Sequence, residues 1–170
     1  DKEFENDLSI TEDQYIEMIE KKTGSLLGAC AALSATLVGA DQEVINYFDQ
    51  FGRALGNGFQ IHDDLLEIYG NPNEMGKSLG SDIAVGKQTM MVIKARNLSG
   101  KEWGEIIGDP DRIDFMDKIR SFFTENGIEN ETKGLAQTYF DLARNSLEKI
   151  DGINCSELFD FVNLVETRRY

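Results

Sequence analysis

The chain has 170 residues, with 31 acidic and 17 basic side chains and a formal net charge of -14. This length allows one domain with a hydrophobic core. Hydrophobic residues make up 41% and charged residues 28%, which is the balance of a soluble globular protein. Such an acidic chain is not expected to bind nucleic acid or an anionic membrane surface, because basic surfaces bind both. An anionic substrate would need local lysines or bridging cations.

The cysteines and an uncharged run near the start of the chain indicate in which cellular compartment the protein is expected. Cys30 and Cys155 are too few for a disulfide framework, and Cys30 is expected to be a buried thiol among small apolar residues. We therefore expect a reduced, cytoplasmic setting. Residues 23–40 lack charge, but their many Gly, Ala, Ser and Thr residues favour a packed core helix over a membrane span. The acidic first segment has no signal-peptide pattern and begins with Asp, so we expect a fragment or a processed product.

Apolar residues recur at spacings of three and four, and only two prolines occur, so the sequence predicts an all-α fold. Thr11 and Gln14 have the spacing of a capping box, which predicts the start of the first helix. Gly24 and Gly28 in that helix would let another backbone approach closely. A second helix is expected over residues 41–68. The loop that follows, residues 70–86, has four glycines, which indicate an ordered, turn-rich segment or a flexible one.

The second half of the chain continues the helical pattern. The Asp109–Asp111 run, with proline at its centre, resembles a helix start. An apolar stripe from Ile113 to Phe123 follows, and Gly127 is a typical helix stop. The chain is therefore predicted to be a single all-helical domain, or part of one. Further helices are expected over residues 88–97, 132–150 and 156–169, the second of them with an apolar stripe from Ala136 to Ile150.

Three carboxylates gather on the helix that includes residues 56–70. Asp63 and Glu67 are four residues apart and share a face, while Asp64 lies about 100° round from Asp63. Gln60 lies one turn before the aspartates. Like charges at this spacing repel, so we expect the cluster to have no structural use. A divalent cation would remove the repulsion, and Mg²⁺ takes one or two carboxylates with water and substrate phosphate. The cluster thus predicts a metal site for a diphosphate ligand, with a solvated acidic face as the alternative.

Lysines lie on both sides of this cluster in the sequence. Lys77 and Lys87 stand among the glycines of the loop, where they and the backbone amides could approach an anion closely, or could be ordinary surface lysines. Lys22 is the last charged residue before the uncharged run, and it either binds phosphate or solubilises a helix end. His62 beside the cluster raises the question of zinc, but one His without nearby Cys is a poor zinc set.

Four motifs occur in an order that resembles the trans-prenyl diphosphate synthases, the polyprenyl synthetase family. The motifs are KTG, FQxxDDxxE, GKxxGxD and GKxT, at residues 22–24, 59–67, 76–82 and 86–89. The whole chain resembles the second half of such a synthase. The resemblance implies the C-terminal portion of an isoprenoid-synthase-type helical bundle, usually a homodimer. The first DDxxD motif of the family is absent, so we expect the chain to need a missing N-terminal half for activity.

Family members join an allylic diphosphate to isopentenyl diphosphate, with Mg²⁺ bridging the aspartate motifs and the allylic diphosphate. By position, the resemblance implies that Asp63 binds Mg²⁺ directly, and that Asp64 and Asp82 bind it directly or through water. The family usually has Asp where this chain has Glu67, which leaves the role of Glu67 open. The residues that the resemblance places at the allylic substrate, as catalytic or binding groups, are Lys22, Thr23, Phe59, Gln60, Lys77 and Lys87.

Two other functions are compatible with the same motifs. A non-catalytic subunit could keep the fold for dimerisation or regulation, but it would be expected to lose some of the motif lysines and aspartates. A terpene cyclase shares the fold and the diphosphate chemistry. The FQxxDD and GKxxGxD pair favours a prenyl diphosphate synthase over a cyclase.

Overall fold

The computed structural model describes residues 2–70 and 80–168. Every regular element in these two ranges is a helix, which confirms the predicted all-α class. The elements in chain order are η1 (Lys2–Phe4), α1 (Glu12–Ile19), η2 (Glu20–Gly24), α2 (Ser25–Leu37), α3 (Gln42–Tyr69), α5 (Ser81–Ala84), α6 (Met90–Ile107), α7 (Phe115–Glu125), α8 (Ile128–Glu148) and α9 (Ser156–Thr167).

The chain divides into two compact units. One is built from the residues up to Tyr15 together with Asp63–Lys133, and the other from Ile16–His62 and Gly134–Arg168. Helices α1, α3 and α8 each contribute residues to both units. The single domain expected from the sequence stays a prediction.

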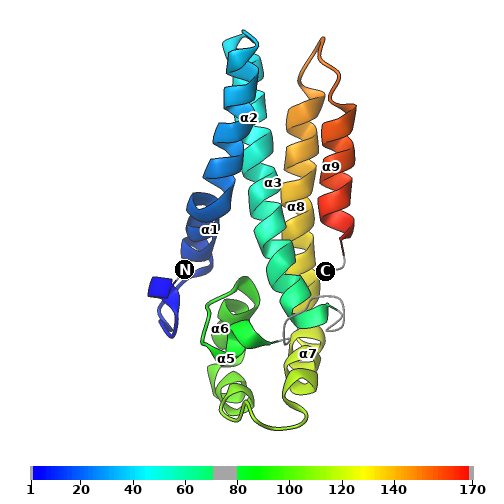
Figure 1. The fold of residues 1–170 in the computed structure, drawn as a ribbon. Helices are drawn as coiled ribbons and strands as arrows, with labels where there is room; N and C mark the ends of the chain where they lie inside the picture. The colour runs from blue at the N-terminus through cyan, green and yellow to red at the C-terminus, as the bar shows by residue number, and fades with distance from the viewer. Residues whose placement is uncertain (1, 71–79, 169–170) are drawn as a thin grey trace. The chain divides into compact units, whose positions relative to one another are not determined.

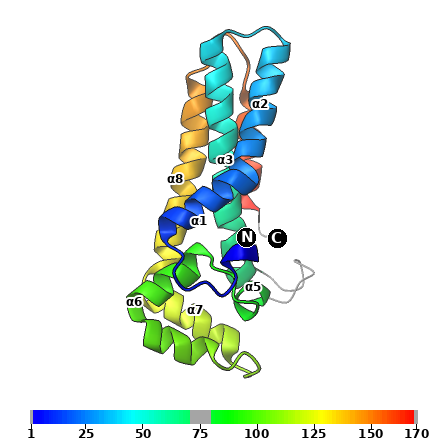
Figure 2. The same ribbon diagram turned by 90° about the vertical axis from the view of Figure 1, so that its left-hand side faces the viewer.

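The second unit is a bundle of long helices. Its part of α3 runs beside α2 and beside α8 in both Figure 1 and Figure 2. The apolar stripe predicted for α8 forms part of its core. The buried members of that stripe are Ala136, Phe140, Ala143, Leu147 and Ile150.

Glycines bring α3 close to η2 and α2, as the sequence indicated. A Cβ atom added at Gly52 would lie 2.4 Å from the carbonyl oxygen of Leu27. One added at Gly56 would lie 2.8 Å from the Cα atom of Gly24. Backbone therefore packs on backbone along this seam, and a larger side chain has no room there.

The first unit packs α6 against α7 around aromatic side chains. The Trp103 ring stacks on Phe123 with centroids 5.2 Å apart, and both are buried. Lys94 Nζ lies 3.1 Å from a Glu12 carboxylate oxygen and 3.0 Å from one of Glu131, which links α6 to the starts of α1 and α8. These contacts place α6 so that the segment before it can reach the end of α3.

The start of α1 follows the predicted capping box. The Gln14 backbone N–H donates to Thr11 Oγ1 at 3.2 Å, and the Thr11 backbone N–H donates to Gln14 Oε1 at 2.9 Å. The two residues thus satisfy each other's backbone donors at the helix start.

The helix predicted over residues 88–97 corresponds to the first segment of α6, which has a break in helical geometry at Ser99 and then continues to Ile107. One predicted boundary in the second half is wrong. Helix α7 begins at Phe115, later than the Asp109–Asp111 run indicated, and Ile113 is fully exposed. The proline run forms a turn instead, because the chain must reverse between the packed helices α6 and α7. Gly127 ends α7 as predicted, with a φ of 73°.

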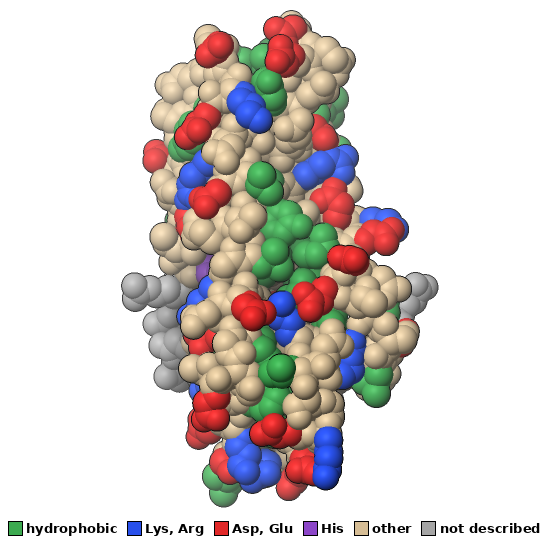
Figure 3. Space-filling view, turned by 180° about the vertical axis from the view of Figure 1, so that it is seen from behind, with side chains coloured by type: hydrophobic (Ala, Val, Ile, Leu, Met, Phe, Trp, Pro, Cys, Tyr) green, Lys and Arg blue, Asp and Glu red, His purple; other side chains and the backbone are tan. Residues whose placement is uncertain are grey.

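The uncharged helix α2 presents apolar side chains to solvent. Cys30 is exposed, so the expectation that it is buried is wrong. Leu26, Leu33 and Leu37 on the same helix are exposed as well. Figure 3 shows apolar side chains lying between charged ones on one face of the molecule. Within the described residues, the length and apolar content needed to cross a membrane are not met by any helix.

The glycine seam makes a first prediction. Gly52→Ala is expected to lower the free energy of unfolding by about 1–3 kcal/mol, because the new methyl group overlaps the Leu27 carbonyl. Gly134→Ala is the matched control, since Gly134 is inside helix α8 and a Cβ there meets nothing within 4 Å. That change should raise the free energy of unfolding by about 0.5–1 kcal/mol. Urea denaturation followed by circular dichroism measures both, and equal effects would contradict the close approach.

Candidate functional site

A single lysine joins two of the predicted metal ligands. Lys87 Nζ lies 3.0 Å from Asp64 Oδ1 and 2.6 Å from Asp82 Oδ2. The Lys87 backbone N–H also donates to the Asp82 carbonyl at 2.9 Å. Burial alone would lower the pKa of Lys87, but attraction to both carboxylates raises this pKa above its ordinary value. The ammonium therefore stays charged and holds α5 and the following turn against α3.

Asp64 is a buried carboxylate with a partner on each oxygen. Its side chain is 2% exposed. Lys87 binds Oδ1, and the Tyr15 hydroxyl donates to Oδ2 at 2.7 Å. Burial raises the pKa of Asp64 above its ordinary value, and the Lys87 charge and the Tyr15 hydrogen bond oppose that rise without cancelling it. The sequence did not indicate this hydrogen bond, since no local pattern links Tyr15 and Asp64, which are 49 residues apart.

Glu67 also has structural partners in the first unit. Its Oε1 atom accepts a 2.8 Å hydrogen bond from Ser81 Oγ and a 3.1 Å hydrogen bond from the Asp82 backbone N–H. Glu67 and Asp64 are one turn apart on α3, and both are buried. The expectation that the acidic cluster has no structural use is therefore wrong for these two residues, because the loop after α3 supplies donors to both.

Asp63 differs from its neighbours in the cluster. It is exposed, whereas Asp64 and Glu67 are buried. Among the described residues, no three His, Cys, Asp or Glu side chains gather closely enough to hold a metal ion by themselves. A metal ion held at this end of α3 would therefore need oxygen atoms from water or from a bound ligand.

In the second unit, the KTG motif adopts an unusual backbone. Residues Glu20–Gly24 form a π-helical turn, and such turns are frequent at functional sites. The Thr23 hydroxyl donates to Gln60 Oε1 at 3.4 Å, so two of the predicted catalytic residues are in contact. Glu20 ties this turn to α3, because the Asn57 amide donates to Glu20 Oε2 at 2.8 Å and the Arg53 guanidinium pairs with Oε1. Sequence analysis missed this role of Glu20.

The other predicted residues have different outcomes. Lys77 lies outside the described residues. Placement of Lys22 beside the carboxylates stays a prediction, as does an isoprenoid pocket at Phe59. The Phe59 ring lies under the Arg168 guanidinium at 4.2 Å, and His62 makes an edge contact with Phe140 at 6.2 Å.

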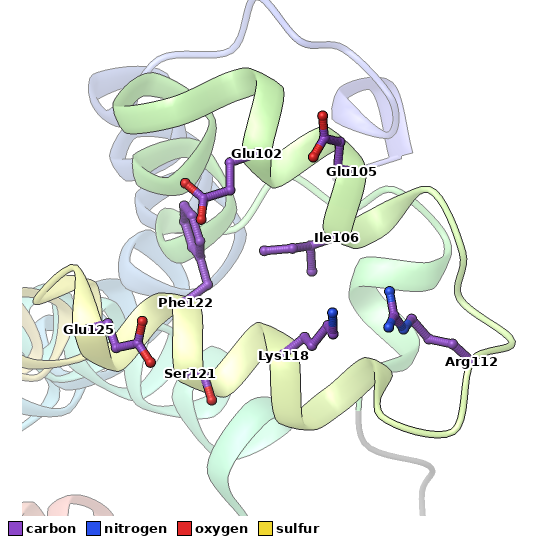
Figure 4. Close-up of a pocket in the computed structure, with 8 residues that line it drawn as sticks. All are labelled: Glu102, Glu105, Ile106, Arg112, Lys118, Ser121, Phe122 and Glu125. Carbon is purple, nitrogen blue, oxygen red and sulfur yellow. The ribbon is translucent and has the colours of Figure 1, made fainter.

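A cavity of about 370 Å³ in the first unit contains none of the predicted residues. Figure 4 shows its lining side chains coming from α6, α7 and the segment between them. Arg112 in that lining is paired with Asp114. Carboxylates outnumber cations in this cavity, so it does not resemble an anion site. The lining residues are Glu102, Glu105, Ile106, Arg112, Lys118, Ser121, Phe122 and Glu125.

The buried Tyr15–Asp64 hydrogen bond makes a second prediction. Tyr15→Phe is expected to lower the free energy of unfolding at pH 7 by about 1–3 kcal/mol, because it leaves a buried carboxylate oxygen without this donor. Because the folded-state pKa of Asp64 is raised, Asp64 favours folding most at pH values below its ordinary pKa of 3.8. That contribution to the free energy of unfolding is lost as the pH rises through the folded-state pKa. Losing the Tyr15 donor raises the folded-state pKa further, so the penalty should be larger at pH 7 than at pH values below 3.8.

Denaturation at both pH values measures this penalty. Tyr47→Phe is the control, because Tyr47 makes a similar 2.8 Å hydrogen bond to Glu43 on the exposed surface. Its penalty should stay below about 0.5 kcal/mol at either pH. A Tyr15→Phe penalty that does not change with pH would contradict the role of the ionised carboxylate.

Known proteins share both the sequence and the fold of this chain. The model of the family described as polyprenyl synthetase matches residues 1–121. A short chain isoprenyl diphosphate synthase of Methanothermobacter thermautotrophicus is 34% identical over 167 residues, which cover 94% of this chain and 51% of that protein.

Two crystal structures show the likeness in three dimensions. A decaprenyl diphosphate synthase from Rhodobacter capsulatus has a TM-score of 0.85 at 30% identity, over 99% of this chain and 54% of that one. A polyprenyl synthase from Caulobacter crescentus, complexed with calcium and isoprenyl diphosphate, has a TM-score of 0.84 at 27% identity, over 98% and 53%. The chain spans about half the length of these relatives. Its motifs, its helical fold and these matches together show that it belongs to the polyprenyl synthetase family.

Proposed function

We propose that this chain forms the diphosphate-binding half of a trans-prenyl diphosphate synthase. The complete enzyme would join an allylic prenyl diphosphate to isopentenyl diphosphate, head to tail. The observation that carries this proposal is the Lys87 ammonium bound between Asp64 and Asp82 at the end of α3. It brings positive charge and carboxylate oxygens together, which is the combination that binding a metal–diphosphate complex requires.

Mg²⁺ is the cation that we propose. Asp63, Asp64 and Asp82 offer only oxygen atoms, which Mg²⁺ prefers, and it commonly uses one or two carboxylates with water and phosphate oxygens. Asp63 is the exposed one of the three, so we propose it as the direct ligand, with Asp64 and Asp82 acting directly or through water. When bound, Mg²⁺ supplies positive charge that stabilises a departing diphosphate.

The chain's own residues would act on the allylic diphosphate as follows. Lys87, with Lys22 and Lys77, stabilises the negative charge that develops when the bond between the allylic carbon and the diphosphate oxygen breaks. The electron pair of that bond leaves with the diphosphate. Thr23 and Gln60, which are in contact in the second unit, would lie near the reacting carbons or the diphosphate.

The second substrate completes the reaction. The double bond of isopentenyl diphosphate forms a carbon–carbon bond with the allylic cation. A proton is then lost to the departing diphosphate, which restores a double bond in the longer product. The phenyl ring of Phe59 would line the pocket for the isoprenoid chain.

The remaining parts of the enzyme are part of the same proposal. The chain spans about half the length of its relatives, so activity is expected only together with the other half of the family's length. A homodimer in a cytoplasmic setting is the expected assembly. The solved relative complexed with calcium and isoprenyl diphosphate supports a divalent cation and a prenyl diphosphate as ligands of this protein.

Asp63 tests this function directly. Asp63→Asn in the complete enzyme is expected to lower kcat by about 10²–10⁴-fold, because it removes the exposed carboxylate that would hold the cation. The free energy of unfolding should stay within about 0.5 kcal/mol, because Asp63 is on the exposed surface and the change keeps its size and shape. Steady-state kinetics with an allylic diphosphate and isopentenyl diphosphate in Mg²⁺ measure the loss.

Glu43→Gln is the matched control, since Glu43 is an exposed carboxylate in the first turn of the same helix. Its kcat should stay within about twofold of wild type. An Asp63→Asn enzyme that keeps wild-type turnover would rule out the metal role. No prenyl transfer by the wild-type complete enzyme would favour the non-catalytic subunit instead.

A further inference from the structure

Glu67 fastens the short helix α5 to the end of α3. Its Oε1 atom accepts hydrogen bonds from both Ser81 Oγ and the Asp82 backbone N–H, at 2.8 and 3.1 Å. The Glu67 backbone carbonyl accepts a third, from the Gly80 N–H at 3.3 Å. One residue of α3 therefore receives three hydrogen bonds from three consecutive residues at the start of α5.

Helix α5 depends on such contacts. It has four residues, Ser81–Ala84, which is far too short to be stable by its own backbone hydrogen bonds. Apart from the bonds to Glu67, it is held by buried Ile83 and by the ion pair of Asp82 with Lys87. Glu67 is itself only 8% exposed. Its carboxylate therefore has little contact with water, and these donors take the place of water molecules.

Asp82 is consequently positioned from two sides. Glu67 holds its backbone, and Lys87, which also binds Asp64, holds its carboxylate. Both anchors start from the same face of α3, one helical turn apart. Without the Glu67 anchor, the Asp82 carboxylate would still be paired with Lys87. The Asp82 backbone, however, could move.

We propose that Glu67 is a positioning residue, which sets the place of Asp82 in the diphosphate site and does not itself bind the metal ion. The role in the reaction rests on the function proposed above, whereas the hold on α5 does not. Glutamate suits this task because its side chain is longer than that of aspartate by one carbon–carbon bond, about 1.5 Å. The Ser81 hydroxyl and the Asp82 backbone N–H donate to the same oxygen atom of Glu67, so the task requires an acceptor at that distance and not a second charge.

Two substitutions separate the two roles, because each keeps one property of Glu67 and removes the other. Glu67→Gln keeps Oε1 at the same reach but loses the charge. Glu67→Asp keeps the charge but withdraws the acceptor from Ser81 and Asp82. A positioning residue tolerates glutamine better than aspartate, whereas a metal ligand tolerates aspartate better than glutamine.

The first measurement is hydrogen–deuterium exchange of the Ser81–Ala84 amides in the complete enzyme, without metal or substrate. Glu67→Asp should speed this exchange by about tenfold or more, and Glu67→Gln by no more than about threefold. Exchange in the core of α8, which does not depend on this contact, should be unchanged in both. Glu43→Asp, at an exposed position of α3, is the control and should leave α5 as in wild type.

The second measurement is the Mg²⁺ concentration that half-saturates binding of inorganic diphosphate. It should rise by about fivefold or more in Glu67→Asp and by no more than about twofold in Glu67→Gln. The reverse order in either measurement would overturn the proposal. If the wild-type enzyme binds no diphosphate in Mg²⁺, the proposed function fails and so does the reaction role of Glu67. The exchange results would then still report whether it holds α5.

Discussion

The arrangement of the first unit depends on compensating the charge of Asp64. A carboxylate that is 2% exposed is costly unless charged or polar partners surround it. The partners come from two distant parts of the chain, Tyr15 in α1 and Lys87 before α6. Each partner binds one oxygen of the Asp64 carboxylate, so both are needed to compensate its burial. One buried charge therefore links α1, α3 and the turn that follows α5. The same requirement keeps Lys87 charged and directed at the end of α3.

The second unit is organised by close packing of helix backbones, whereas the first is organised by the buried charge of Asp64. Glycines on α3 and on η2 and α2 let backbones touch, which fixes the distance between these helices. The π-helical turn holds one more residue than an α-helical turn of the same path, and Glu20 binds it to Arg53 and Asn57 of α3. Thr23 lies within this turn and contacts Gln60 as a result. The KTG motif is thus held through packing and through a neighbouring carboxylate outside the motif.

Sequence patterns predicted the features that are local or periodic. The α8 stripe from Ala136 to Ile150 is buried as predicted, because a 3.6-residue period identifies one face of a long helix. The capping box at Thr11 formed, because both of its hydrogen bonds lie within four residues. Helix α5 was missed, since four residues are too few to show a period and its stability comes from tertiary contacts.

The errors at the site have a related cause. Lys87 was assigned to the diphosphate through the order of the motifs, and that role stays a prediction, whereas its ion pairs with Asp64 and Asp82 could not be read from the motifs. Tyr15 could not be found in this way, because it is 49 residues from Asp64 and its spacing matches that of an apolar core residue. The late start of α7 was missed because Asp and Pro favour a turn as readily as a helix start, and packing between α6 and α7 decided between them.

The acidic cluster itself requires a different explanation from the one its spacing indicated. Repulsion among three neighbouring carboxylates indicated either a metal ion or a solvated acidic face. Two of the three are compensated by the protein, Asp64 by Lys87 and Tyr15, and Glu67 by the donors of α5. Clustering alone is therefore weak evidence for a metal ion. The stronger evidence is the difference in exposure, because buried Asp64 and Glu67 organise the loop that carries Asp82, while Asp63 at their side faces solvent. A ligand can reach an exposed charged side chain next to such a network from solvent, and the network itself does not have to reorganise.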